Sequence, residues 1–303
     1  MRVVMPTSLS STAIDLSRIP APEIIQQVDY EATLTAMTAQ LVAIYPEFSA
    51  LIESDPAIKL LEVAAYFVML ERQAFNERAR GLLVAYATGG DLDQLALLFG
   101  IERLTITPAN VETGAPAVME SDEALRRRIL LAPDGYSVAG PATAYAFHAL
   151  TADGEVLDAS AISPEPGEVL VSILARSGDG TAPAPLIATV TAAVNGDTVR
   201  PLTDLVTVRS AEIIHVAITA TLTLFYGPDT QMVVDNATAA LAAYIASTRR
   251  LGRDLTRSGI IAALHAPGVQ NVALTSPVAD VVCNATQAVH VTATTVTLAG
   301  TSE

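Results

Sequence analysis

The chain has 303 residues, of which 51% are hydrophobic and 16% charged, so it can bury enough apolar surface for about two domains and is not intrinsically disordered. Its 17 basic and 32 acidic side chains give a net charge of −15, which disfavours binding to nucleic acid or to an anionic membrane surface. The sequence therefore predicts a globular protein with no nucleic-acid partner and no membrane partner.

Cysteine content and hydropathy exclude further classes of protein. The single cysteine, Cys283, cannot form an internal disulfide or supply a zinc cluster of thiolates. The most apolar stretch, Leu60 to Leu70, contains Glu62 and is much shorter than a transmembrane helix requires. Residues 1–11 have no apolar segment ahead of a cleavage site, so we expect no signal peptide and assembly in a reducing cytoplasm.

The first third of the chain is predicted to be helical after an extended, proline-containing lead-in. One helix is expected over 29–45, with an aspartate as its N-cap. A longer helix is expected from Pro56 to about Ala87, where Gly89 and Gly90 would stop it, and a short helix over 92–99 follows.

The long predicted helix carries two apolar stripes with helical spacing. The first consists of Leu61, Ala65, Val68, Arg72, Phe75, Ala79 and Leu82, and the second of Leu60, Val63, Phe67, Leu70 and Ala74. Two stripes predict two neighbours, which leaves open the core of the chain's own helical bundle, a second chain, or both. The polar residues that interrupt and follow the first stripe must find partners if they are buried.

The middle of the chain is predicted to alternate helices and strands. Ser121 is a suitable N-cap for a helix that carries Arg126, Arg127 and Arg128, and Pro141 is placed to begin the next helix. Residues 105–116, punctuated by proline and glycine, are expected to be an extended linker and a candidate hinge. Strands are predicted over 156–162, 169–174 and 206–208, with a helix over 185–194.

The last section has a similar order of strand, turn and helix, which suggests a second copy of the middle unit. Its strands are predicted over 213–225, 269–274 and 287–298, and its helices over 230–247 and 258–265. The alternation of apolar residues in the final strand slips phase after Ala293, which predicts a bulge.

These elements together predict an α+β fold class. A helical, bundle-forming section with an extended lead-in is expected over 1–107, followed by two small α+β domains with mixed or antiparallel sheets over 108–211 and 212–303.

No group of residues has the spacing of a known catalytic or ligand-binding motif. The incomplete nucleophile elbow around Ser137 lacks its final glycine, and Gly178-Asp179-Gly180 lacks the spacing of a dinucleotide or phosphate loop. The histidines are scattered without metal-ligand spacing, at His148, His215, His265 and His290. We therefore expect no enzyme, cofactor or metal, with a hydrolase that uses Ser137 or a histidine as the remaining alternative.

Sixteen of the seventeen basic residues are arginines, and the sequence has two clusters of them. These are Arg126 to Arg128, and the group Arg249, Arg250, Arg253 and Arg257. Because arginine forms bidentate contacts with carboxylates, the clusters predict either intramolecular salt bridges or contacts between subunits.

Short motifs in a fixed order resemble the baseplate J-like proteins of contractile-tailed bacteriophages over nearly the full chain. They are Leu16-Ser17-Arg18-Ile19-Pro20-Ala21-Pro22, Glu53-Ser54-Asp55-Pro56, Lys59-Leu60-Leu61-Glu62, Arg72 with Asn76-Glu77, Asp91-Leu92-Asp93, Arg103-Leu104-Thr105-Ile106-Thr107-Pro108-Ala109, Met119-Glu120-Ser121-Asp122, Ser137-Val138-Ala139-Gly140, Arg250-Leu251-Gly252-Arg253-Asp254 and Gly268-Val269-Gln270.

The resemblance implies a structural baseplate wedge protein without catalytic residues, present in several copies around the tail of a virion and assembled in the host cytoplasm. It implies that copies pair within each wedge, that the N-terminal helices contribute to a bundle, and that the C-terminal domains link wedges into a ring. The implied partners are a neighbouring wedge protein and the sheath-initiating, hub-proximal baseplate protein. A tailocin or another contractile injection system would use an equivalent protein.

Periodicity and resemblance together give a set of candidate subunit-interface residues on the long helix and in the second arginine cluster. They are Leu61, Ala65, Val68, Arg72, Phe75, Asn76, Ala79, Arg80, Leu82, Arg250 and Arg253.

Overall fold

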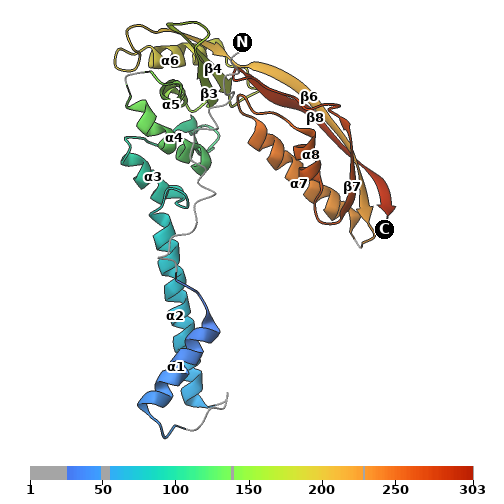
Figure 1. Cartoon of the computed structure of the whole chain (residues 1–303). Coiled ribbons are helices and arrows are strands. Elements are labelled where there is room, and N and C mark those ends of the chain that lie inside the picture. The colour runs from blue at the N-terminus through green and yellow to red at the C-terminus, as the bar shows by residue number, and fades with distance from the viewer. Residues whose placement is uncertain (1–25, 49–54, 138–139, 228, 303) are drawn as a thin grey trace. The chain divides into compact units, whose positions relative to one another are not determined.

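The computed structural model describes residues 26–48, 55–137, 140–227 and 229–302, and the chain divides into two compact units (Figure 1). The described residues up to Glu102 form a helical unit, and Arg103 begins the second unit, which contains the larger sheets. Helices followed by mixed and antiparallel sheets confirm the predicted α+β class. The division into three domains stays a prediction.

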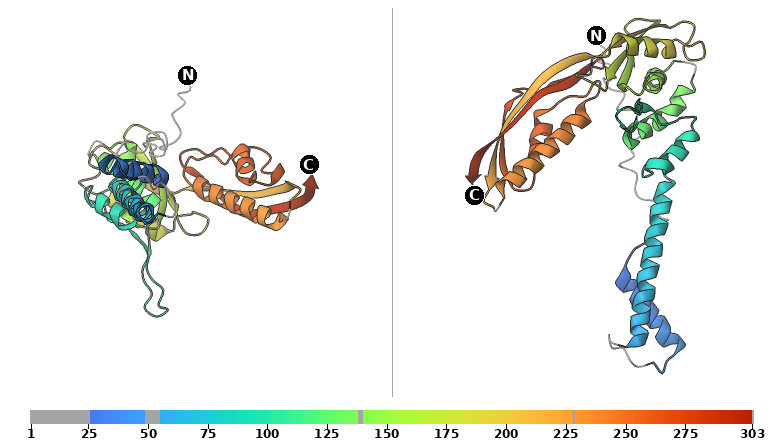
Figure 2. Two further views of the ribbon diagram at one scale, coloured as in Figure 1. Left: turned by 90° about the horizontal axis from the view of Figure 1, so that it is seen from below. Right: turned by 180° about the vertical axis from the view of Figure 1, so that it is seen from behind.

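The helical unit has three helices, α1 (Tyr30–Ile44), α2 (Pro56–Gly81) and α3 (Gly89–Leu97). As predicted, Asp29 is the N-cap of α1 and accepts a hydrogen bond from the backbone N–H of Ala32 at 2.9 Å. Asp55 caps α2 in the same way, immediately before Pro56 at its first position. Figure 2 shows α1 lying alongside α2 in both views.

The end of α2 differs from the prediction, since the helix stops at Gly81 and not near Ala87. A Cβ atom at Gly81 would lie 2.6 Å from a carboxylate oxygen of Asp91, so this glycine allows the first turn of α3 to approach the end of α2. Residues 82–86 form turns, and Gly89, with φ of +53°, lies in α3 and does not terminate α2.

The predicted linker over 105–116 is part of a β-hairpin. Strands β1 (Thr105–Thr107) and β2 (Val118–Met119) pair antiparallel, and Asn110 bridges to Ala115 beyond them. The Asn110 side chain accepts hydrogen bonds from two backbone N–H groups of the turn. The segment is therefore paired and not an extended linker, and its role as a hinge stays a prediction.

The middle of the chain forms a three-stranded sheet with helices packed on it. Strand β4 (Glu168–Ala175) is central, with β3 (Val156–Ile162) antiparallel on one side and β5 (Leu205–Ser210) parallel on the other. The helices are α4 (Asp122–Gly135), α5 (Ala142–Ala152) and α6 (Ala184–Val194). The predicted strands and helices, including the Ser121 cap of α4, are confirmed.

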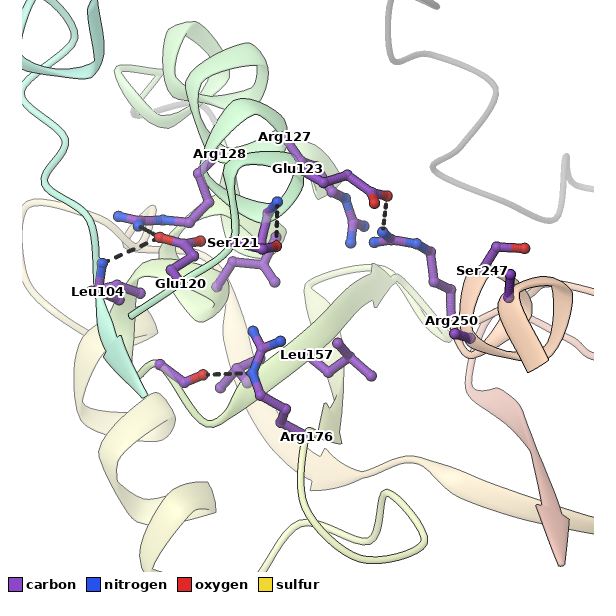
Figure 3. Close-up of a pocket in the computed structure, with 16 residues that line it drawn as sticks. Leu104, Glu120, Ser121, Glu123, Arg127, Arg128, Leu157, Arg176, Ser247 and Arg250 are labelled. Carbon is purple, nitrogen blue, oxygen red and sulfur yellow. Dashed lines mark hydrogen bonds and ion pairs between the residues drawn. The ribbon is translucent and has the colours of Figure 1, made fainter. Parts of the chain in front are cut away.

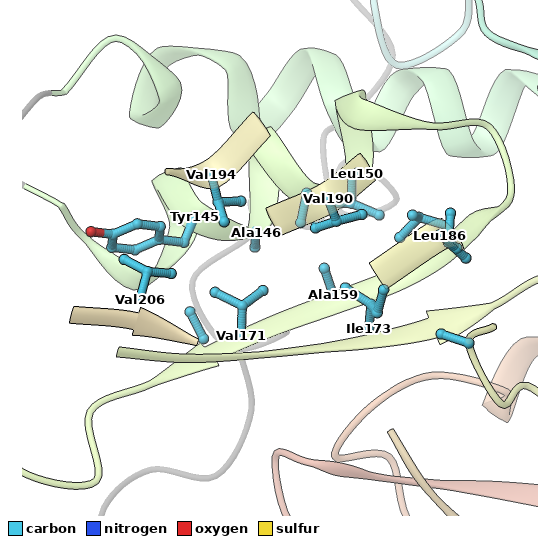
Figure 4. Packing of buried hydrophobic residues seen from close by; sticks show 14 of the residues in the cluster. Tyr145, Ala146, Leu150, Ala159, Val171, Ile173, Leu186, Val190, Val194 and Val206 are labelled. Atoms are coloured by element: carbon cyan, nitrogen blue, oxygen red, sulfur yellow. The ribbon is translucent and has the colours of Figure 1, made fainter. Parts of the chain in front are cut away.

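The hydrophobic core of this section lies between the three-stranded sheet on one side and helices α5 and α6 on the other (Figure 4). Val171 and Ile173 from β4 face Leu186 and Val190 from α6 across it. Tyr145 of α5 is buried at one end, where its hydroxyl donates to Asp204 at 2.8 Å. Burial and this carboxylate raise the pKa of Tyr145, which keeps the ring neutral in the core.

The last section has the strands β6 (Glu212–Phe225), β7 (Val269–Ser276) and β8 (Gln287–Ser302) and the helices α7 (Thr230–Thr248) and α8 (Arg257–Leu264). β6 is central, antiparallel to β7 and parallel to β8. Both helices lie on one face of this sheet (Figure 2). The predicted bulge after Ala293 is wrong, because the pairing of β6 with β8 is regular from Ala293 to Leu298. The irregularities lie outside that segment, where the pairing skips Thr292 and Ala299.

The two larger sheets do not repeat one another in chain order. In each sheet the central strand has one antiparallel and one parallel neighbour. The antiparallel strand β3 precedes β4 in the chain, however, whereas the antiparallel strand β7 follows β6. The similarity that suggested a second copy therefore extends only to strand, turn and helix.

Cys283 is buried against the core of the last section, and its pKa rises to about 11 through burial and the nearby carboxylate of Asp254. At pH 8 we expect its reaction with iodoacetamide to be about a hundredfold slower than that of an ordinary thiol, because so little thiolate is present. Mass spectrometry of timed samples measures the rate, and the same chain in urea is the control. Equal rates with and without urea would contradict the burial of this thiol.

Candidate functional site

The contact between α1 and α2 uses the first apolar stripe of α2. Ala65 and Asn76 are the buried side chains of α2, and Arg72 donates to the hydroxyl of Thr33 in α1 at 3.2 Å. The Asn76 side chain accepts from the backbone N–H of Gln26 and donates to its carbonyl, each at 2.8 Å. The polar residues of this stripe thus find partners inside the chain, which favours the intrachain neighbour for this face.

The predicted interface residues on α2 differ in exposure. Ala65 and Asn76 are buried, Leu61, Val68, Arg72 and Ala79 are half-buried, and Phe75, Arg80 and Leu82 are exposed. Ala65 and Asn76 are thus already covered by their own chain. The set stays a prediction.

The second stripe of α2 is exposed in this structure except at Ala74, which is half-buried. Leu60 is 72% exposed, Val63 55% and Phe67 60%, while Leu70 and the adjacent Tyr66 are also exposed. Tyr66 and Phe67 contact each other edge to face, with ring centroids 6.0 Å apart. Large apolar side chains that recur along one helix face form a surface typical of protein contacts. We call Leu60, Val63, Tyr66, Phe67 and Leu70 the outer face of α2.

Replacing Asn76 by leucine should destabilise the start of the helical unit by about 1–3 kcal/mol, because the N–H and carbonyl of Gln26 lose their partner. Hydrogen exchange of peptides that cover α1 should become roughly tenfold faster or more. Alanine at the exposed Gln73 of the same helix is the control and should leave this exchange unchanged. Equal protection in both variants would show that Asn76 does not hold the segment.

The arginine clusters form ion pairs within the second unit (Figure 3). Arg128 and Glu120 are a buried pair at 2.6 Å, in which the two side chains are 3% and 4% exposed. Arg127 pairs with Asp158 at 2.6 Å, and Arg250 with Glu123 at 3.0 Å. Of the two predictions for these clusters, intramolecular salt bridging accounts for these arginines.

The ion pairs also connect the middle section to the last one. Asp158 of β3 accepts from the backbone N–H of Leu251 at 2.9 Å, and Ser160 of the same strand donates to the carbonyl of Ala285. Leu251 is buried in a small apolar cluster with Leu174 and Ala288. Arg250 therefore lies where both sections meet, whereas Arg253 is exposed.

The serine and two of the histidines considered for a hydrolase make contacts of the kind that support the fold. Ser137 follows α4, and its backbone N–H donates to Asp134 at 3.1 Å. His148 is half-buried with its ring 3.2 Å from the carbonyl of Gly135, and burial lowers its pKa. His215 contacts Asp179 at 3.2 Å on the surface. Within the described part of the chain, no cluster of histidine, cysteine and acidic side chains is suited to a metal, and no helix could span a membrane.

Sequence reasoning identified both stripes of α2 but assigned the subunit contact to the first one. The available signal was that Arg72 interrupts the first stripe and the polar Asn76 lies beside it, whereas the second stripe is entirely apolar. A buried polar residue needs a fixed partner, which an adjacent segment of the same chain supplies readily. The outer face is therefore the better candidate for contact with another chain.

Comparisons with known proteins cover the chain in three successive parts. Family models match at residues 53–110 for the baseplate J-like N-terminal domain, at 137–210 for the baseplate J-like central domain and at 216–299 for the baseplate J-like protein C-terminal domain. The chain is also 44% identical over 299 residues to baseplate protein J of Escherichia phage P2, covering 96% of this chain and 99% of that protein.

Proposed function

The chain belongs to the baseplate J-like family and is a structural component of a phage tail baseplate, and on that premise we propose that several copies of it build the baseplate wedge of a contractile tail. In this proposal it acts without catalysis. It is assembled in the host cytoplasm and resides in the tail of the virion.

The observation that carries the proposal is the uncovered outer face of α2. A single exposed apolar side chain is common on protein surfaces and needs no explanation. Leu60, Val63 and Phe67 together, however, form a continuous apolar strip along one helix. Burying such a strip against another helix gains roughly 25 cal/mol for each Å² of apolar surface removed from water. We propose that copies pair within a wedge through this face, so that α2 contributes to an intermolecular helical bundle.

The remaining contacts are proposed to involve two other proteins, a neighbouring wedge protein and the sheath-initiating, hub-proximal baseplate protein. Exposed arginines on an acidic chain support polar contacts of this kind, because they can pair with carboxylates on a partner. Arg80 on α2 and Arg253 in the last section are exposed and suited to this role.

The proposal is tested by co-expressing the full chain with the product of the adjacent downstream tail gene. Light scattering on a sizing column then gives the mass of the complex. A stable complex that contains two copies of this chain is the expected result. A monomer that does not bind its neighbour would overturn the wedge assignment.

A further inference from the structure

A cavity of 490 Å³ opens in the second unit between the start of α4, strand β3 and the end of α7. Four arginines line it, namely Arg127, Arg128, Arg176 and Arg250, together with Glu120 and Glu123. Figure 3 shows the guanidinium groups of Arg127, Arg176 and Arg250 directed into the same space. In a chain of net charge −15, this is a local concentration of positive charge.

Two of these arginines retain donors that other residues do not use. Arg128 and Arg250 pair with the glutamates of the cavity. Arg127 uses one terminal nitrogen on Asp158, while its Nη1 is buried without a hydrogen-bond partner. Arg176 donates through Nε to the carbonyl of Gly154 at 3.1 Å and has no ion pair among the described residues. Because a buried donor without a partner is costly, Arg127 gains free energy if its Nη1 turns toward an acceptor in the cavity.

The remaining wall is apolar and comes from several elements. Leu150 of α5, Leu157 of β3, and Ala243 and Ala246 of α7 line it. Such a wall suits the methylene groups of a side chain, and the guanidinium groups suit a planar carboxylate, which arginine binds with two parallel hydrogen bonds. A small inorganic anion would use the arginines but leave the apolar wall in contact with water.

We propose that this cavity binds a glutamate side chain from a partner protein, with Arg127 and Arg176 as its carboxylate-binding residues. The inference rests on the proposed assembly function for the source of the glutamate. The chemistry of the cavity belongs to this chain alone and is testable on it.

The probe is the capped tripeptide acetyl-Gly-Glu-Gly-amide, titrated into the full chain while the methyl NMR signals of Leu157 and Ala243 are followed. The matched peptide with glutamine and inorganic phosphate are titrated separately. We expect saturable shifts with the glutamate peptide and at least roughly tenfold weaker binding of the glutamine peptide. Tighter binding of phosphate, or no saturable shift with the glutamate peptide, would overturn the inference.

Variants locate the binding site. Arg176→Gln should weaken binding of the glutamate peptide about tenfold or more, because it removes a guanidinium that binds the carboxylate. Among the described residues Arg176 forms no ion pair, so the variant loses only its hydrogen bond to the carbonyl of Gly154. Arg127→Gln is the second variant, and the exposed Arg209→Gln, which removes the same charge outside the cavity, is the control. Equal affinity of the Arg176 and Arg209 variants would contradict the assignment.

Failure of this inference differs from failure of the proposed function. If the chain forms the two-copy complex with its neighbour but does not bind the peptide, the cavity assignment is wrong and the wedge proposal stands. If the isolated chain binds the peptide through Arg176 but forms no complex, the cavity assignment stands and the wedge proposal fails.

Discussion

Replacing Phe67 by glutamate should leave the chain folded but reduce the yield of infectious particles at least about a hundredfold. Phe67 is exposed in the single chain, so a carboxylate there costs the monomer little. In the proposed paired wedge the same carboxylate would be buried without a partner. This burial reduces the free energy of association by several kcal/mol at each contact between copies. Complementation of a phage that lacks this gene, followed by plaque counting, measures the effect.

Gln73→Glu is the matched control for Phe67→Glu. Gln73 is exposed at the edge of the outer face, seven residues after Tyr66, where a carboxylate can stay in contact with water. Its side chain donates to Glu77 at 3.1 Å. We expect near-normal particle yield from this variant. Similar losses in both variants, or a normal yield from Phe67→Glu with a folded chain by circular dichroism, would show that the outer face makes no essential contact.

Removing the carboxylate of the buried ion pair should cause the largest loss of stability of any single substitution considered. Glu120→Ala removes the carboxylate that pairs with the buried Arg128 at 2.6 Å, and it also removes the acceptor of the Leu104 N–H. The expected cost is about 3–5 kcal/mol of unfolding free energy for the second unit. Urea unfolding followed by hydrogen exchange of α4 peptides gives this value separately from the helical unit.

Two further variants separate charge burial from packing. The more exposed pair of Arg250 and Glu123 in the same unit is the control, and Glu123→Ala should cost less than about 1 kcal/mol. The double variant Glu120→Leu with Arg128→Met should recover most of the lost stability, because no unpaired charge remains. A cost below about 1 kcal/mol for Glu120→Ala would mean that water reaches this pair.

Local sequence signals predicted most of the secondary structure. Asp29, Asp55 and Ser121 mark the starts of α1, α2 and α4 because each side chain satisfies a backbone N–H that the helix leaves free. The strand over 156–162 has the predicted bounds. These features depend on neighbours within a few residues, which a sequence displays directly.

Features that depend on distant neighbours were not predictable in the same way. Gly81 ends α2 where Asp91 approaches it, and β1 is a strand only because β2 returns beside it. The cavity is hidden for the same reason, since Asp158 and Leu251 become neighbours only in the folded chain. For α2, periodicity gave both stripes, but only the packing of α1 shows which of them is covered.

Strand β6 cannot complete its pairing during synthesis until β8, the last strand of the chain, has been made. The first half of β6, from Glu212 to Ile218, pairs with β8 alone, because β7 begins its pairing only at Thr219. Until residues 287–302 have left the ribosome, this half presents an open edge rich in isoleucine and valine, which invites aggregation. A chain whose translation stalls before Gln287 is therefore expected to need chaperone protection.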